Sequence, residues 1–369
     1  MKLIRLILSD LHLATGARPG QLNPLEDFFC DDRFAELLAH YDALAGDTMG
    51  VELILNGDIF DLLKVKIGGA WPLEITDAIA VDKLRQCLEG HPVFTRAIRD
   101  FLASSPKHRL TYIPGNHDLD LWFPGPQALL RRYVAPGDAA ERVRFITGSD
   151  TYYLPEGIQI RHGHQLERIH RVDYEAMTER RRDGTEVLTL PWGSLWILEV
   201  MNPLKEARSY IDRVQPLSRF LWGSLVFDPF FVTRFLWRST LYFFRHRVFK
   251  LAAWRARWRM LPRLIHEELT EMVGGFDERA MRALSRVRGV HTLIVGHSHG
   301  PRFLQLPTGK ILVNTGTWVK MIILDLEYLG QDSGLTYAVI EYDDEGRPST
   351  SLMRWLGTHR ACEPVPYQD

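Results

Sequence analysis

Five short polar clusters in this sequence combine carboxylate, imidazole and amide side chains, the groups that bind divalent cations and transfer protons. They are Asp10-Leu11-His12, Gly57-Asp58-Ile59-Phe60-Asp61, Gly115-Asn116-His117-Asp118, His162-Gly163-His164 and Gly296-His297-Ser298-His299. Any one of them is explained as well by turn chemistry or by a surface histidine. The ordered set is more specific, because oxygen and imidazole ligands without thiolates suit zinc, iron or manganese. The sequence therefore predicts a metal site assembled from distant segments.

Each cluster follows a short apolar run of the kind that forms a buried strand. The predicted strands are 3–8, 51–55, 109–113, 158–160, 292–295 and 311–313. Helix-like stretches at 32–44 and 81–102 lie between the early runs, and this alternation is typical of an α/β sheet covered by helices. Ligands of such sheets bind beyond the carboxyl ends of the strands, which is where all five clusters lie.

Composition indicates a globular chain and excludes some classes of function. The chain has 369 residues, is 46% hydrophobic and carries a net charge of −1, so it has no global basic field for nucleic acid. Cys30, Cys87 and Cys362 are far apart and form no CxxC pair, which fits a reducing compartment. The N-terminal stretch MKLIRLILSDLHL is interrupted by Arg5 and reads as a first strand. We expect a cytoplasmic protein.

Residues 165–276 differ from the rest of the chain, with few strand signals and many aromatic and basic side chains. The stretch 205–263 has 13 lysines and arginines against three acidic residues. We interpret 165–276 as a helical, basic and aromatic insertion between two parts of one domain, 1–164 and 277–369. An ordinary helical subdomain with a buried aromatic core remains an alternative.

The five clusters resemble the motifs of the calcineurin-like metallophosphoesterase superfamily, and they span nearly the whole chain outside the insertion. The resemblance implies a four-layer αββα sandwich, with two packed sheets and helices outside, and a pair of metal ions. Manganese is the metal we favour, with iron and zinc as alternatives. By resemblance, the first metal is held by Asp10, His12 and His299, the second by Asn116, His162 and His297, and both by the bridging Asp58.

The resemblance also implies the chemistry, which is in-line attack of a metal-bridging hydroxide on a phosphoester or pyrophosphate bond. Asp58 has two carboxylate oxygens with which to reach both metals. His117 is expected to serve the substrate, and Asp61 to orient its imidazole. Asp61 as a helix cap is an alternative. Asp118 is interpreted as a turn or supporting residue, His164 as a supporting or surface residue, and Asn314 with Thr315 as a site lining or a plain strand-end turn.

The substrate is predicted less directly. Asp61 is followed by Leu62-Leu63, where protein phosphatases of the superfamily have Arg-Gly. The basic and aromatic insertion is similar to the lid of UDP-diacylglucosamine pyrophosphohydrolases, although those enzymes commonly have arginine at the position of His117 and a shorter insertion. We therefore expect a phosphorylated lipid or nucleotide-lipid substrate and a peripheral contact of 205–263 with the inner face of the membrane. A nuclease, a cyclic-nucleotide phosphodiesterase and a non-catalytic metal-bound scaffold are the alternatives, with nucleic acid the less favoured partner.

Overall fold

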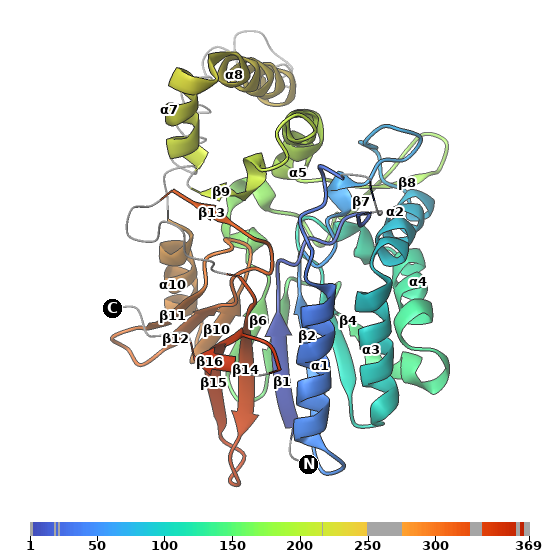
Figure 1. Ribbon diagram of the computed structural model, residues 1–369, viewed down its shortest axis with the longest axis vertical. Coiled ribbons are helices and arrows are strands. Elements are labelled where there is room, and N and C mark those ends of the chain that lie inside the picture. The colour runs from blue at the N-terminus through green and yellow to red at the C-terminus, as the bar shows by residue number, and fades with distance from the viewer. Residues whose placement is uncertain are drawn as a thin grey trace.

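Two sheets face each other in the computed structural model (Figure 1), which describes residues 3–17, 20, 23–215, 217–248, 275–324, 334–358 and 362–364. The larger sheet contains, in spatial order, β16 (Cys362–Pro364), β15 (Pro348–Trp355), β14 (Thr336–Tyr342), β1 (Leu3–Leu8), β2 (Gly50–Asn56), β3 (Arg109–Ile113) and β4 (Val143–Phe145). The smaller sheet contains β11 (Arg302–Gln305), β12 (Ile311–Asn314), β10 (Thr292–Val295), β6 (Ile158–Arg161) and β5 (Thr151–Leu154). The site-bearing neighbours β1, β2 and β3 are parallel, as are β6 and β10.

Alternating side chains of the strands build two cores. In β1, Leu6 and Leu8 face the helices, whereas Ile7 faces the second sheet. This alternation follows from the pleat, which turns successive side chains to opposite faces. Between the sheets, Ile7 belongs to the same buried cluster as Ile160 and Ile294 of the smaller sheet.

Helices cover the outer faces of both sheets. On the larger sheet these are α1 (Asp31–Ala45), α2 (Asp77–Gly90), α3 (Pro92–Ser104) and α4 (Pro124–Val134) (Figure 1). On the smaller sheet, α10 (Phe276–Arg286) packs Ala280 and Leu284 against the outer face of β10 and β12. The four-layer αββα sandwich is thereby confirmed.

One predicted helix is wrong in extent. The stretch 81–102 is not a single helix, because α2 ends at Gly90 and α3 begins at Pro92. Proline has no backbone N–H to continue a helix, but it is favourable at the first position of a new one. The apolar spacing continues across this break, which is why the sequence pattern concealed it.

The predicted insertion contains strands as well as helices. Its described elements are β7 (Thr178–Arg180), β8 (Glu186–Leu188), α5 (Trp192–Trp196), the π-helix η6 (Ile197–Met201), α6 (Asn202–Lys205), β9 (Val214–Gln215), α7 (Leu217–Phe227), α8 (Pro229–Phe243) and the π-helix η8 (Phe244–Val248). Strand β9 pairs with β13 (Ile322–Ile323), so the segment is tied to the main fold by backbone hydrogen bonds. Helices α7 and α8 lie at the end of the molecule beyond the sheets (Figure 1). Residues 249–274 fall outside the described part, and the boundaries at 164 and 277 stay predictions.

Short 3-10 turns complete the chain: η1 (Leu62–Lys64), η2 (Leu119–Trp122), η3 (Gly137–Arg142), η4 (His164–Leu166), η5 (Arg168–His170) and η7 (Ile211–Arg213). Among the described helices, none has the length and apolar character needed to cross a bilayer.

Candidate metal centre

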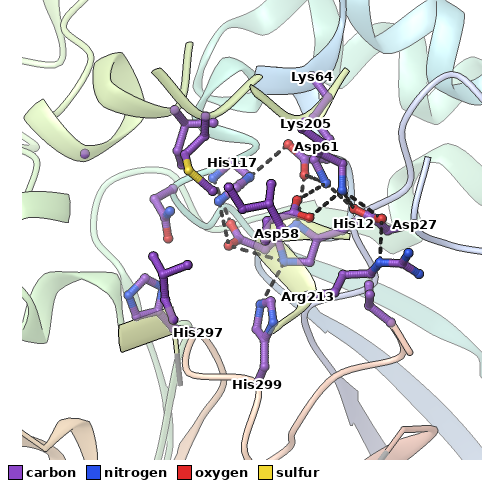
Figure 2. Close-up of a pocket in the computed structure, with 18 of the residues that line it drawn as sticks. His12, Asp27, Asp58, Asp61, Lys64, His117, Lys205, Arg213, His297 and His299 are labelled. Carbon is purple, nitrogen blue, oxygen red and sulfur yellow. Dashed lines mark hydrogen bonds and ion pairs between the residues drawn. The ribbon is translucent and has the colours of Figure 1, made fainter. Parts of the chain in front are cut away.

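The predicted ligand residues meet at one edge of the two sheets. The loops after β1, β2 and β3 of the larger sheet bring together Asp10, His12, Asp58, Asn116 and His117, and the loops after β6 and β10 of the smaller sheet add His162, His297 and His299. Figure 2 shows several of these side chains pointing toward a common centre.

An unusual backbone conformation directs several of these side chains toward the centre. Asp10, His12, Asp58, His297 and His299 have positive φ angles of 55°, 54°, 53°, 72° and 62°, and Leu335 is the only other non-glycine residue with this conformation among those described. A left-handed conformation costs a non-glycine residue about 1–3 kcal/mol and is retained where the surrounding structure enforces it. Here the loops enforce it with backbone hydrogen bonds, because Asp10 N donates to Gly57 O at 3.1 Å and His12 N to Asp58 O at 3.0 Å.

The first group of donors contains Asp10, His12 and His299. The Nε2 atoms of His12 and His299 lie 3.0 Å apart, and His299 Nε2 lies 3.4 Å from Asp10 Oδ1. Two imidazole nitrogens and a carboxylate oxygen converging in this way match the donors that zinc, manganese and iron accept. This is the set that the family resemblance assigns to the first metal.

The second group contains His162, His297 and Asn116. In the described structure, His162 Nε2, His297 Nδ1 and Asn116 Oδ1 are buried and have no hydrogen-bond partner. Buried polar atoms nearly always have a hydrogen-bond partner. Three nitrogen and oxygen atoms without one, all in one place, are therefore suited to bind a cation. His162 Nδ1 donates to Asn56 O at 2.9 Å, which leaves Nε2 with its lone pair directed inward.

Asp58 lies between the two groups. Its Oδ1 accepts a hydrogen bond of 2.8 Å from the backbone N of His117. Its Oδ2 lies 3.2 Å from His162 Nε2 and 4.0 Å from His12 Nε2. Asp58 Oδ2 therefore lies near imidazole nitrogens of both groups. A Cβ at Gly115 would overlap with Asp58 Oδ1, which explains the glycine before Asn116.

Asp61 connects two histidines through its two oxygens. His117 Nδ1 donates to Oδ1 at 2.8 Å, and His12 Nδ1 lies 3.2 Å from Oδ2. The side chain of Asp61 does not cap η1, so the alternative of a helix cap is wrong. Burial alone would lower the pKa of His117, but the carboxylates of Asp61 and Asp58 raise it to about 9. His117 Nε2 remains directed toward the centre, 4.0 Å from Asp58 Oδ2.

Buried ion pairs link the insertion to this dyad. Lys64 Nζ lies 2.8 Å from Asp61 Oδ2 and 3.1 Å from Asp212 Oδ2. Lys205 Nζ lies 2.7 Å from Asp27 and 2.5 Å from Asp212 (Figure 2). Lys205 belongs to the basic and aromatic stretch 205–263, yet it is 1% exposed. Burial would raise the pKa of Asp61, but Lys64 and His117 hold it well below its usual range, so the carboxylate stays ionised.

Glu167 is a supporting residue that the sequence did not reveal. Its Oε2 lies 3.1 Å from His297 Nε2, and Arg279 anchors the other oxygen at 2.5 Å. A carboxylate on the outer nitrogen of a histidine orients the inner nitrogen toward a metal, here Nδ1. Burial would raise the pKa of Glu167, but the hydrogen bond with His297 lowers it to about 2. Glu167 lies outside the five sequence clusters, so no sequence pattern identified it as part of the site.

The structure also places the residues whose roles the sequence left open. Asp118 accepts hydrogen bonds from Gly115 N and Ile59 N, and therefore supports the turn. His164 is buried, which excludes the surface alternative. Asn314 donates to Ser298 and accepts from Gly316 N, so it and Thr315 form a strand-end turn. Neither Asn314 nor Thr315 lines the cavity.

The donor groups open into a cavity of about 360 Å³. Beyond the ligand residues, one wall carries the charged side chains Asp27, Lys64, Lys205, Asp212 and Arg213. Another wall is apolar and is built mainly by the insertion, with Ile169, Trp192, Trp196, Ile197, Met201, Ile211, Val214, Leu217, Val319 and Met321. The cavity therefore has both charged and apolar side chains in its lining.

Comparison with known proteins agrees with the motifs. The family model described as calcineurin-like phosphoesterase matches residues 5–301. Similar solved structures include a dimetal phosphatase from Danio rerio (TM-score 0.40, 10% identity, 99% of each chain covered). A 5'-nucleotidase precursor from Thermus thermophilus is also similar (TM-score 0.34, 13% identity, 95% of this chain and 54% of that chain covered). No curated protein sequence matches this chain.

Replacing Glu167 by alanine should weaken metal binding while the fold is retained. The loss of its hydrogen bond frees the ring of His297, and such supporting partners typically contribute about 10–100-fold in metal affinity. Titration calorimetry of the metal-free protein with Mn²⁺ measures this directly. Glu175→Ala, at an exposed acidic residue, is the matched control. Equal affinities of the Glu167 and Glu175 variants would show that Glu167 does not position a ligand.

Proposed function

Because the chain belongs to the calcineurin-like phosphoesterase family, we propose that its two donor groups hold two divalent cations that share Asp58. The chain is a metal-dependent phosphoesterase, and the donor set of imidazole, carboxylate and amide without thiolate supports manganese, iron or zinc. Such a pair of cations activates a water nucleophile and neutralises charge on the phosphoryl group. On this proposal, Asp10, His12 and His299 hold one cation, and Asn116, His162 and His297 hold the other.

His117 is proposed as the residue that acts on the substrate. Its Nδ1 is fixed by Asp61, so Nε2 is the nitrogen that can donate a proton. The side chain is 16% exposed and lines the cavity, so a substrate can reach it. An imidazole nitrogen placed there suits stabilisation of a phosphoryl oxygen or protonation of the leaving oxygen. An intact dyad of this kind favours an enzyme over a non-catalytic scaffold.

The substrate is proposed to be a phosphorylated lipid or a nucleotide-lipid, hydrolysed at the inner membrane surface. The observation that supports this proposal is a cavity lined both by ligand residues and by apolar side chains of the insertion. A phosphate bound at the donor groups would place an attached apolar chain against Trp192, Trp196 and Met201. A volume of about 360 Å³ lies within the range of ligand sites, so it accommodates the reacting part of such a molecule.

Nucleic acid is the weaker candidate because the described residues that line the cavity form no basic track. Its lining has three fixed cations, Lys64, Lys205 and Arg213, and five carboxylates, Asp27, Asp58, Asp61, Glu167 and Asp212. Lys64 and Lys205 are also engaged in buried ion pairs. A single strand requires positive charge along its backbone together with stacking residues. The lining supplies two tryptophans but no such charge, which favours one phosphate group at the metals.

Replacing His117 by alanine should lower kcat by about 10²–10⁴-fold, the usual contribution of a general acid or base. The metal content, measured by inductively coupled plasma mass spectrometry, should stay close to that of the unchanged protein. Asn116→Ala, one residue away, should instead reduce the metal content. If His117→Ala loses metal and keeps its rate per bound metal, His117 is a ligand and the proposed role is wrong.

Trp196→Ala should separate recognition of the apolar group from catalysis. For an acylated substrate such as UDP-diacylglucosamine, kcat/KM should fall at least about tenfold, since about 1.4 kcal/mol of apolar contact has that effect. For bis-p-nitrophenyl phosphate the change should stay within about twofold on the same reasoning. Both are measured with Mn²⁺ alongside single-stranded DNA. A protein that prefers DNA, or a variant that loses both activities equally, would contradict the proposed substrate class.

A further inference from the structure

Helix α8 is apolar on two opposite sides, and only one of them is buried. Phe231 and Phe235 face inward and pack on the core of the insertion. On the other side, Phe230, Trp237 and Leu241 are 88%, 63% and 50% exposed. Their spacing of seven and four residues places them on one face of the helix. A water-exposed face of this composition costs free energy unless another apolar phase covers it.

Helix α7 extends the same kind of surface. Trp222, Val226 and Phe227 are 74%, 75% and 88% exposed. We define the α7–α8 apolar surface as Trp222, Leu225, Val226, Phe227, Phe230, Leu236, Trp237 and Leu241. These eight account for more than half of the 14 exposed large apolar side chains in the described part of the chain. Such concentration on two adjacent helices marks an interaction site, since single exposed apolar residues are ordinary.

The charge on these helices favours an anionic partner. Between Leu217 and Phe243 the sequence has three arginines and one aspartate. Arg219 and Arg234 are exposed. The aspartate, Asp228, lies 2.8 Å from Arg208 and also caps α8 by accepting from Phe231 N. Aromatic and aliphatic side chains together with arginine are typical of helices that lie in a membrane interface.

We propose that the α7–α8 apolar surface docks on an anionic lipid bilayer, with Phe227 and Phe230 at the corner between the helices entering the interface. The proposal rests on the lipid-linked substrate inferred above. Leu217, at the start of α7, lines the cavity, whereas Phe227 ends the helix at the docking surface. Eleven helical residues span about 15 Å, roughly half the hydrocarbon thickness of a bilayer. One helix thus connects the lining of the cavity with the docking surface.

Co-sedimentation of the full chain with vesicles tests this surface. The unchanged protein should bind vesicles of phosphatidylcholine with phosphatidylglycerol, and should bind pure phosphatidylcholine less. The double variant Phe227→Ser/Phe230→Ser should lose at least about tenfold in partition coefficient, because each phenylalanine no longer leaves water on docking. Arg234→Gln should weaken binding to the anionic vesicles, and added salt should reduce the difference.

The matched control is Leu44→Ser/Tyr153→Ser, at two side chains that are 51% and 58% exposed and lie outside α7 and α8. It should bind vesicles as the unchanged protein does. Hydrolysis of bis-p-nitrophenyl phosphate should be the same in both double variants, which shows that each is folded. Membrane docking is refuted if the unchanged protein binds neither vesicle, or if the control loses as much as the phenylalanine variant.

A second copy of the chain is the competing occupant of this surface. Sedimentation velocity that shows a dimer dissociated by Phe227→Ser/Phe230→Ser would overturn membrane docking. The two proposals also fail separately. Vesicle binding without preference for acylated substrates would contradict the proposed substrate but not the docking surface. Preference for acylated substrates without vesicle binding would contradict the docking surface but not the proposed substrate.

Discussion

The rest of the site depends on the contacts that Asp58 makes with the neighbouring loops. The residue is 1% exposed and left-handed, with φ of 53°. Its carbonyl oxygen accepts from His12 N, its Oδ1 accepts from His117 N, and its Oδ2 faces His162. Three loops thus take their positions from one residue. A buried carboxylate must be compensated by positive charge, and the orphaned donors around it indicate that cations supply much of that charge.

The insertion contributes to this centre as well as covering it. It supplies the tryptophans and aliphatic side chains of the apolar wall. Through Asp212, which also pairs with Lys205, it contacts Lys64, which in turn lies 2.8 Å from Asp61. Asp61 fixes the imidazole of His117. Movement of the insertion would therefore change both the space available for a substrate and the electrostatic surroundings of the dyad, because buried ion pairs tolerate the loss of a partner poorly.

Sequence patterns predicted the strands well, but they did not predict the side-chain contacts that support the site. The predicted strands 3–8, 109–113 and 292–295 match the structure, because short apolar runs ended by turn residues have few other interpretations. The five clusters were identified from the residues, the family resemblance assigned their roles, and the structure brings them together. The burial of Lys205 could not be foreseen, since its partner Asp27 lies 178 residues away. Composition also could not tell which side of α8 would be exposed, because a helix with apolar residues on two sides can bury either of them.

Anomalous diffraction from crystals grown with Mn²⁺ tests the central claim most directly. Two peaks are expected about 3.5–4 Å apart, both within coordination distance of Asp58 Oδ2. One should also contact Asp10, His12 and His299, and the other Asn116, His162 and His297. A single peak, or a cation held by the neighbouring group of Glu167, His170 and His297 without Asp58, would contradict it.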